Sequence, residues 1–351
     1  MKSLTHNILA LLLLIPCIAM AGDGPKGKYT KEKKITKAYY VNADAGLDVD
    51  NQFGSIYVTT WDEDKTQIDV IIKVSGNNEE KVDRKLASID VDIEALKSMV
   101  SAKTRLGNVG GNGLTFEINY TVRIPKKGSI DLKNQYGAII TGKIFGKSRI
   151  DCQYGDVSID ELHNDVNSII LQYSGTSKAN FIKSCDINGQ YSGINIGKAG
   201  NIKLKTQYTG TNIGEVNNIE YKTEYGDINV KRANNVTGTG DYSPLMFGNI
   251  SGNFNATCNY GEVRINDLSA SAKNVAINAT YTNIVVNYRE GYAFDFEFQL
   301  EYGNLRGAGA FKFTEKSDKD NRSHYKGYNV RAGANRMYIK SEYGDINLGK
   351  A

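Results

Sequence analysis

The sequence holds few of the residues on which most catalytic and metal sites depend. It has three histidines and four cysteines among 351 residues, and His6 and Cys17 lie within the first 21. The other two histidines, His163 and His324, stand far apart, and no histidine and cysteine cluster has the spacing of a zinc site. No Gly-x-Ser-x-Gly turn and no phosphate-binding loop occurs. We therefore expect no catalytic residue, no metal and no cofactor.

Long apolar runs are confined to the N-terminus, and no later segment approaches the roughly 18 apolar residues of a membrane span. The run from Ile8 to Ile18 follows Lys2 and precedes a small-residue cleavage site that ends at Ala21, which is typical of a secretory signal. We expect residues 1–21 to be removed and the protein to be exported, to the periplasm or to the cell surface at the outer membrane. A lipid anchor on Cys17 is less favoured, because Pro16 stands where a small residue is expected.

A strong net charge is also missing. Removing residues 1–21 takes away one of the 43 basic residues and none of the 39 acidic ones, which leaves a net charge of +3. So small a value for so long a chain gives no reason to expect a nucleic-acid partner. The basic stretch at 26–37 predicts a solvated linker over 22–37, although it could also touch an anionic lipid or polysaccharide.

What the sequence does contain is one short phrase, written twelve times around an aromatic residue. From Tyr136 to Tyr302 the phrases follow each other at steps of 17 to 21 residues, which is long enough for two short strands and two turns. We therefore predict an all-β, parallel β-solenoid of two-strand rungs. The alternative, an antiparallel β-sandwich, fits the constant step less well. The aromatic residues are Phe53, Tyr136, Tyr154, Tyr173, Tyr191, Tyr208, Tyr225, Tyr242, Tyr260, Tyr281, Tyr302 and Tyr343.

Apolar residues alternate on both sides of each aromatic residue, which is the period-2 pattern of half-buried strands. The tyrosines share parity with the apolar positions, so we expect their rings to point into the core or its corner. The residue two places before is mostly small and should pack beside the ring. The residue just before, often glutamine, should face water and bond along a column. The glycine, serine or threonine just after should form the bend, with glycine free to adopt a positive φ.

Three cysteines fall on inward positions of different rungs, namely Cys152, Cys185 and Cys258. Cys152 and Cys258 share one column six rungs apart, or ~29 Å at the strand spacing, which no disulfide can bridge. We predict three free, buried thiols. Pairing between molecules is the alternative.

The repeat is interrupted twice. Residues 38–129 predict N-terminal strands and a section that caps the solenoid, with strands at Ile68–Val74, Ile89–Ile93 and Leu114–Ile124 and a helix at Glu79–Leu86. The solenoid itself should fill 130–351. A polar loop insertion is expected at 312–336, and the residues singled out in it are Asp318, Asp320, Arg322, His324, Tyr325, Tyr328 and Arg331.

Carboxylates recur two residues after the aromatic position and could form a column that binds calcium. Glycine or proline breaks the column in several rungs, so we favour solvated turn acids. The segment from Asp318 to Ser323 begins like an EF-hand loop but lacks its glycine. The acids of the column are Asp156, Asp227, Glu262 and Asp345.

Several phrases together resemble a known family, the exported "putative adhesin" domains of unknown function from Bacteroidetes, which are related to the head-GIN domain. They are Lys28 to Lys33, Leu47 to Ile56, Ile118 to Lys126, the Tyr-Gly-Asp-Ile-Asn rungs and Gly193-Ile194-Asn195. The resemblance covers nearly all of the exported chain. It implies a right-handed β-solenoid in the cell envelope and carries over no catalytic residue.

Three functions are open from the sequence. The favoured one is a non-catalytic, adhesin-like envelope or surface protein that binds polysaccharide or protein partners along its side. The second is a polysaccharide-active β-helix enzyme, which would need charged residues such as Asp318, Asp320 and Arg322 to converge with acids of neighbouring rungs. The third is a self-assembling structural protein stacked end to end, against which the capping section argues.

Overall fold

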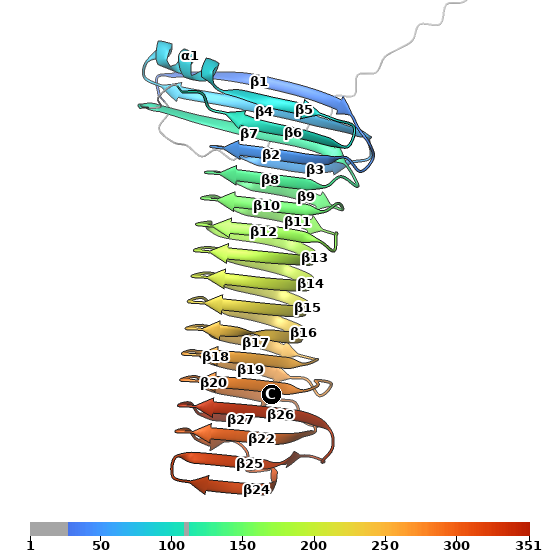
Figure 1. The fold of residues 1–351 in the computed structure, drawn as a ribbon, viewed down its shortest axis with the longest axis vertical. Helices are drawn as coiled ribbons and strands as arrows, with labels where there is room; N and C mark the ends of the chain where they lie inside the picture. The colour runs from blue at the N-terminus through green and yellow to red at the C-terminus, as the bar shows by residue number, and fades with distance from the viewer. Residues whose placement is uncertain (1–26, 109–111) are drawn as a thin grey trace, which may run out of the picture.

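The chain forms a long rod, a flattened coil whose two sides are parallel sheets that face each other (Figure 1). The computed structural model describes residues 27–108 and 112–351, so the expected signal peptide and Cys17 lie outside the described residues. Neighbouring rungs pair in parallel and in register, as in Ile196 with Ile213 and Leu204 with Tyr221. The predicted β-solenoid is therefore confirmed, and the antiparallel sandwich is wrong.

Each rung runs along one sheet, turns at an edge and returns along the other sheet. Sheet 1 holds β2 (Gly46–Gln52), β8 (Ile130–Gln135), β10 (Ser148–Gln153), β12 (Asn167–Gln172), β18 (Phe254–Asn259), β20 (Val275–Thr280), β26 (Asn335–Glu342) and β22 (Phe294–Glu301). Sheet 2 holds β3 (Ile56–Trp61), β9 (Ile139–Ile144), β11 (Val157–Leu162), β17 (Pro244–Ile250), β19 (Glu262–Leu268), β21 (Asn283–Tyr288), β27 (Ile346–Lys350) and β23 (Leu305–Arg306). Four long strands cross from sheet 2 to sheet 1: β13 (Thr176–Gln190), β14 (Gly193–Gln207), β15 (Gly210–Glu224) and β16 (Ile228–Asp241).

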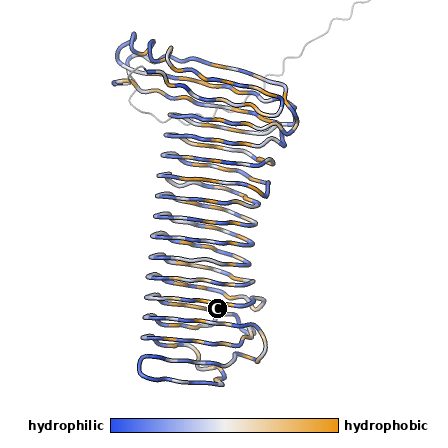
Figure 2. The backbone as a smooth tube through the Cα atoms, in the orientation of Figure 1, coloured by the Kyte–Doolittle hydropathy of each residue, from blue (hydrophilic) through white to orange (hydrophobic). Residues whose placement is uncertain are grey.

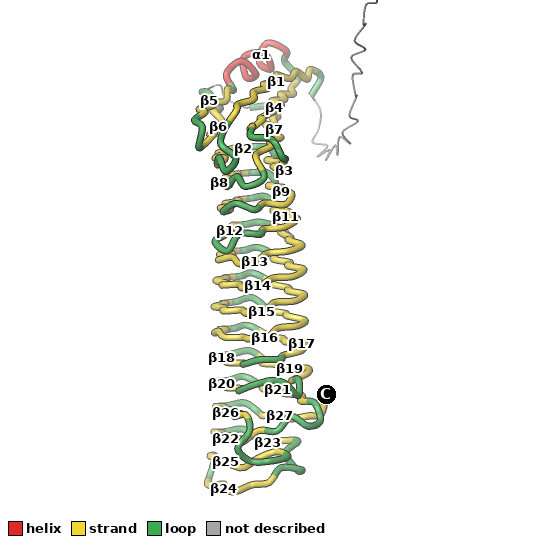
Figure 3. The backbone as a smooth tube through the Cα atoms, turned by 90° about the vertical axis from the view of Figure 1, so that its right-hand side faces the viewer, coloured by secondary structure: helices red, strands yellow, loops and turns green. Residues whose placement is uncertain are grey.

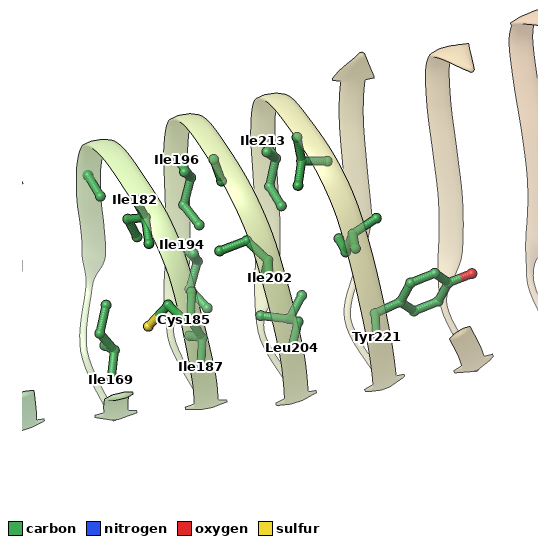
Figure 4. Packing of buried hydrophobic residues seen from close by; sticks show 14 of the residues in the cluster. Ile169, Ile182, Cys185, Ile187, Ile194, Ile196, Ile202, Leu204, Ile213 and Tyr221 are labelled. Atoms are coloured by element: carbon green, nitrogen blue, oxygen red, sulfur yellow. The ribbon is translucent and has the colours of Figure 1, made fainter. Parts of the chain in front are cut away.

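The core is a column of apolar side chains between the two sheets. In Figure 4 the labelled residues of β13 to β15 point into the space enclosed by each turn of the coil, and Figure 2 shows the matching alternation of hydropathy along the chain. Ile194 and Ile196, three and five places after Tyr191, are both buried, as the alternation predicted. Full burial of one such side chain stabilises the fold by about 1.5–3 kcal/mol. Stacked rungs therefore share one continuous core.

At the N-terminal end the chain leaves the repeat and covers the first rung. β7 (Leu114–Pro125) pairs with β3, and β4 (Lys65–Gly76) and β1 (Tyr29–Tyr40) extend the same sheet antiparallel. β6 (Met99–Arg105) pairs with β2 and carries β5 (Asp90–Ala95) on its outer side. The predicted helix is confirmed as α1 (Glu79–Ser88), capped by the Asn78 side chain and packed on β4 and β1. The three strands predicted in this section are confirmed as β4, β5 and β7.

The basic stretch is a strand rather than a linker. From Tyr29 onward it forms β1, whose half-buried positions carry Lys31 and Lys33 beneath α1. Lys31 pairs with Glu79 and Asp83 of the helix, at 3.0 and 2.8 Å. The alternation was hidden because lysines occupy the inward positions, where the helix supplies carboxylates for Lys31 and Asp90 of β5 supplies one for Lys33.

At the C-terminal end the last two rungs lie out of chain order. The rung of β26 and β27 inserts between β20–β21 and β22–β23. In between, the segment expected to be a loop forms a hairpin of β24 (Lys312–Lys319) and β25 (Arg322–Asn329), antiparallel to β22. The prediction of a loop was wrong. Most side chains on both faces of these two strands are polar, so the sequence shows no apolar alternation there. The step of 41 residues from Tyr302 to Tyr343 thus holds one rung and one hairpin.

The edge opposite the aromatic residues is bonded by asparagine side chains. Asn218 donates to Asn201 at 2.7 Å, and Asn235 donates to Asn218 at 2.8 Å. Asn235 in turn accepts from the backbone N–H of Asn253 at 2.9 Å, and Asn253 accepts from that of Asn274 at 3.3 Å. We call this the asparagine edge. Its amides satisfy each other and the backbone at the bend.

Candidate functional site

The twelve aromatic residues of the repeat form one stacked ladder along an edge of the rod, which we call the tyrosine edge. It is the edge to which the arrowheads of β8, β10 and β12 point in Figure 1. Successive ring centroids lie 4.6–5.2 Å apart and ring planes differ by 2–15°. The spatial order is Phe53, Tyr136, Tyr154, Tyr173, Tyr191, Tyr208, Tyr225, Tyr242, Tyr260, Tyr281, Tyr343 and Tyr302.

The rings face outward, so the prediction that they point into the core is wrong. The tyrosines of the ladder are 44–51% exposed. Every ladder residue has a left-handed backbone, with φ between 50° and 61°. A left-handed residue breaks the alternation of a strand, so parity with the inward positions is lost at this residue. The strain of about 1–2 kcal/mol per residue is opposed by stacking contacts of about 0.5–1.5 kcal/mol each.

The residue after each ring closes the turn against the rung before it. At Gly137 an added Cβ would lie 1.9 Å from the carbonyl oxygen of Gly54, although the φ of Gly137 is not positive. Where a hydroxyl residue stands instead, as at Ser192, it donates to the carbonyl of Gln190 at 2.8 Å and accepts from the N–H of Ser174 at 3.2 Å. Glycine is thus needed in the rungs where the backbone approaches this closely, and in every rung the aromatic residue has a positive φ.

Two columns flank the ladder. On the sheet 1 side Gln135 donates to Gln153 at 3.0 Å and Gln153 donates to Gln172 at 3.3 Å, which confirms the predicted glutamine column. The small residues two places before the rings are buried, as predicted, and Cys152 and Thr206 are examples.

The acidic column lies on the sheet 2 side. Asp156 and Asp227 are exposed, Glu262 pairs with Arg264, and Asp345 pairs with Arg306 at 3.0 Å. Across residues 27–108 and 112–351, no three histidine, cysteine, aspartate or glutamate side chains converge as a metal site would need.

The ladder presents ring edges and hydroxyl groups, because each ring face is covered by the next ring. Among the described residues, no ladder hydroxyl makes a hydrogen bond to the protein. Each phenol can donate one hydrogen bond and accept another. The edge therefore offers a row of free phenol groups at the strand spacing of about 4.8 Å. A ligand can reach these groups only from the side.

The C-terminal hairpin brings together several residues that the sequence singled out. Asp320, Arg322 and His324 line a cleft of about 610 Å³ together with Glu301 and Glu342 from neighbouring rungs. Arg322 bonds to Glu301 at 3.1 Å. Asp318 lies outside this cleft and accepts from the hydroxyl of Tyr325, and Tyr328 and Arg331 do not line the cleft either.

His324 sits between two carboxylates, 3.3 Å from Glu297 and 3.3 Å from Glu315. Burial tends to raise the pKa of Glu297, but hydrogen bonds from Gln299, His324 and Arg336 outweigh it and lower that pKa. Arg336 pairs with Glu297 at 3.0 Å. These partners stabilise the anionic form of Glu297.

Other reactive groups are engaged in structure. His163 stacks on Phe145 with centroids 4.6 Å apart and bonds to Glu161 at 2.6 Å. The pKa of Asp48 is raised, chiefly by burial and also by nearby Asp131 on the adjacent strand. The three described cysteines are free and buried, as predicted, and burial raises the pKa of Cys152 to about 12 and that of Cys258 to about 11. A thiol that stays protonated is a poor nucleophile.

Comparison with known proteins finds only distant similarity to solved structures. No protein-family model and no curated protein matches the chain. It is similar to the crystal structure of a "putative adhesin" from Parabacteroides distasonis, with TM-score 0.37, 14% identity, and coverage of 72% of this chain and 93% of that one. For a "putative adhesin" from Parabacteroides merdae the values are 0.36, 12%, 74% and 94%. For a "putative lipid binding protein" from Parabacteroides distasonis they are 0.28, 10%, 90% and 97%. At such values no role passes from these proteins to this chain.

No helix among residues 27–108 and 112–351 has both the length and the apolar character needed to cross a membrane.

Proposed function

We propose that the protein is a non-catalytic, adhesin-like rod of the cell envelope that binds a polysaccharide along its tyrosine edge. The observation that carries this proposal is the row of free phenol groups. A buried hydroxyl needs a partner, whereas these hydroxyls stand in solvent, regularly spaced and unpaired. A polymer rich in hydroxyl groups can bond to several of them at once. Many weak contacts along one chain then add up through multivalency.

The proposal also covers the cellular location of the protein and its family. The run of residues 8–18 supports export to the periplasm or cell surface. The phrases quoted above support membership of the exported adhesin domains related to the head-GIN domain.

The self-assembly alternative has less support. Each end of the rod carries extra antiparallel strands, β1 and β4 at one end and β24 and β25 at the other. The outer strands are charged, with Lys31, Lys33 and Lys34 in β1 and Lys312, Lys316 and Lys319 in β24. Lysine on an edge strand disfavours pairing with another chain.

The test is co-sedimentation of residues 22–351 with insoluble polysaccharides and with envelope fractions. We expect saturable binding to at least one polysaccharide, without release of reducing ends. Binding only to protein-containing fractions would redirect the proposal to a protein partner, and reproducible cleavage of a polysaccharide would contradict it.

A further inference from the structure

The outer face of sheet 2 carries a flat strip next to the ladder. In the first halves of β14 and β15, Gly193 pairs with Gly210 and Asn195 pairs with Asn212. One place further along each strand's outer face, Gly197 lies against Gly214. These six residues, Gly193, Asn195, Gly197, Gly210, Asn212 and Gly214, form what we call the glycine–asparagine patch. Tyr191 and Tyr208 stand at its border, because each lies two residues before a glycine of the patch.

The patch has no charged side chain, in contrast to the other face of the same strands. On sheet 1 the outward residues of β14 and β15 include Lys203, Lys205, Glu220 and Lys222, all exposed. These strands therefore do carry charged side chains where they face solvent on sheet 1. Charge is absent within the patch itself, and the nearest charges border it: Lys178, which pairs with Asn195, and Asp227, which lies against Gly210.

Sterics account for only part of the glycine content. An added Cβ would lie 2.8 Å from the carbonyl oxygen of Asn180 at Gly197, and 2.4 Å from that of Gly197 at Gly214, so glycine is needed at both. At Gly210 the nearest atom is Oδ1 of Asp227 at 3.0 Å, the end of a flexible side chain. At Gly193 it is the carbonyl oxygen of Gly175, at 3.1 Å.

Glycine inside a strand therefore weakens the fold at Gly193 and Gly210 without a full steric need. The loss is about 0.5–1 kcal/mol at each position relative to alanine. Neither glycine has a positive φ. What the two glycines provide is an unobstructed surface beside the ring edges of Tyr191 and Tyr208.

The polar groups of the patch suit a ligand that both donates and accepts hydrogen bonds. Asn212 donates to Oδ1 of Asn195 at 3.1 Å. This bond leaves the amide nitrogen of Asn195 and the amide oxygen of Asn212 without a protein partner. The adjoining phenol groups add further donors and acceptors. Hydroxyl groups match all of these. An ionic ligand of either sign would be attracted by one and repelled by the other of the two charges that border the patch, Lys178 and Asp227.

We infer that the glycine–asparagine patch, with Tyr191 and Tyr208, is a binding subsite for an uncharged polysaccharide chain that lies along the rod. This inference rests on the proposed function and narrows it to a place and a ligand class. One rung advances the chain by about 4.8 Å, which is close to the length of one pyranose unit in an extended glycan. Successive sugar units can therefore meet equivalent groups on successive rungs.

A second copy of the protein is a poorer occupant. Two rungs at ~4.8 Å spacing and five residues at ~3.3 Å give a patch of about 160 Å². A stable protein interface buries about 800 Å² on each partner. The patch is too small to hold two rods together by itself, but large enough for two or three sugar units.

The experiment is affinity gel electrophoresis of residues 22–351 through gels that contain a soluble neutral β-glucan, dextran or, as the charged probe, alginate. Gly210→Gln fills the patch, and the double variant Asn195→Ala/Asn212→Ala removes its amides. The matched controls are Ala138→Gln, in the column of Gly210 but three rungs from Gly193, and Asn347→Ala, in the column of Asn195 near the C-terminal end. Denaturation midpoints of all variants show which of them fold.

We expect retardation by a neutral glucan, at least a tenfold weaker affinity for both patch variants, and an unchanged affinity for both controls. Unchanged binding by the patch variants would overturn the subsite and leave the proposed function standing. Preferential binding to alginate would overturn the uncharged ligand class. No retardation by any glycan, together with no co-sedimentation, would overturn the proposed function itself. A dimer in light scattering that Gly210→Gln abolishes would assign the patch to a second copy.

Discussion

The two edges of the rod turn the same chain in different ways. At the asparagine edge the bend is held by amides that bond to each other and to the backbone, as Asn235 does with Asn218 and Asn253. At the tyrosine edge the bend is a single left-handed residue whose ring stacks on its neighbours. The first edge uses up its polar groups internally. The second leaves every phenol group free for another molecule, and this difference points to the tyrosine edge as the binding surface.

The largest effect is expected where the tyrosine edge needs a glycine. Gly226→Ala would place a Cβ 2.2 Å from the carbonyl oxygen of Thr209. Because backbone cannot yield as a side chain can, we expect a loss of about 3 kcal/mol or more in unfolding free energy, measured by urea denaturation. Gly210→Ala, where the nearest atom is a flexible carboxylate, is the control and should change stability by less than about 1 kcal/mol. Equal losses would refute the steric explanation.

The next effect concerns the asparagine edge. Asn235→Ala removes the acceptor of the Asn253 N–H and the donor to Asn218. Leaving such groups unpaired should destabilise the rod by about 1–3 kcal/mol in the same assay. Asn347→Ala, which lies in β27 and takes no part in the bonds of the asparagine edge, serves as comparison. A neutral Asn235→Ala would mean that the amide ladder does not hold this edge.

Alkaline pH should weaken the coil through its buried thiols. The pKa of Cys152 is about 12 in the fold, above its value of ~8.5 when unfolded, so its stabilisation is complete below pH ~8.5 and is lost as pH rises toward 12. We expect about 1.4 kcal/mol lost per pH unit in this window. Cys152→Ala should flatten the decline of stability with pH between 8.5 and 10. An identical slope in wild type and variant would contradict the assignment.

The smallest effect on stability is expected from Tyr208→Phe. The phenol group of Tyr208 has no protein partner, so its removal should change the unfolding free energy by less than about 0.5 kcal/mol. Tyr208→Ala removes two stacking contacts and should lose about 1–3 kcal/mol. The two variants separate the ring, which stabilises the coil, from the hydroxyl, which is available to a ligand. A large loss in Tyr208→Phe would show that the hydroxyl is structural.

The repeat was predictable because its period, its alternation and its small buried residues are local properties of the sequence. The outward direction of the rings was not predictable. A single left-handed residue reverses which face the following side chains point to, and the pattern of apolar and polar residues does not reveal it. β1 was missed because its inward positions carry Lys31 and Lys33, whose carboxylate partners come from α1 and β5, some 50 residues later. The order of the last two rungs was also hidden, because Tyr302 and Tyr343 have the same local sequence signal.

The site was predictable only in part. The glutamine column and the acids followed from the alignment of the phrases. The free hydroxyl row and the glycine–asparagine patch emerged only when the rings were seen to face outward beside Gly193 and Gly210. Of the residues singled out at 312–336, Asp320, Arg322 and His324 share a cleft, whereas Asp318 lies outside it.

The most direct test of the account is hydroxyl-radical footprinting of the tyrosines with and without a saturating neutral glucan. All ladder tyrosines should be oxidised in the free protein, because each is about half exposed. We expect the glucan to protect Tyr191 and Tyr208 and to leave Tyr302 unchanged. A bound glucan that protects no ladder ring, or protects only residues of the C-terminal hairpin, would contradict the claim that the tyrosine edge is the binding surface.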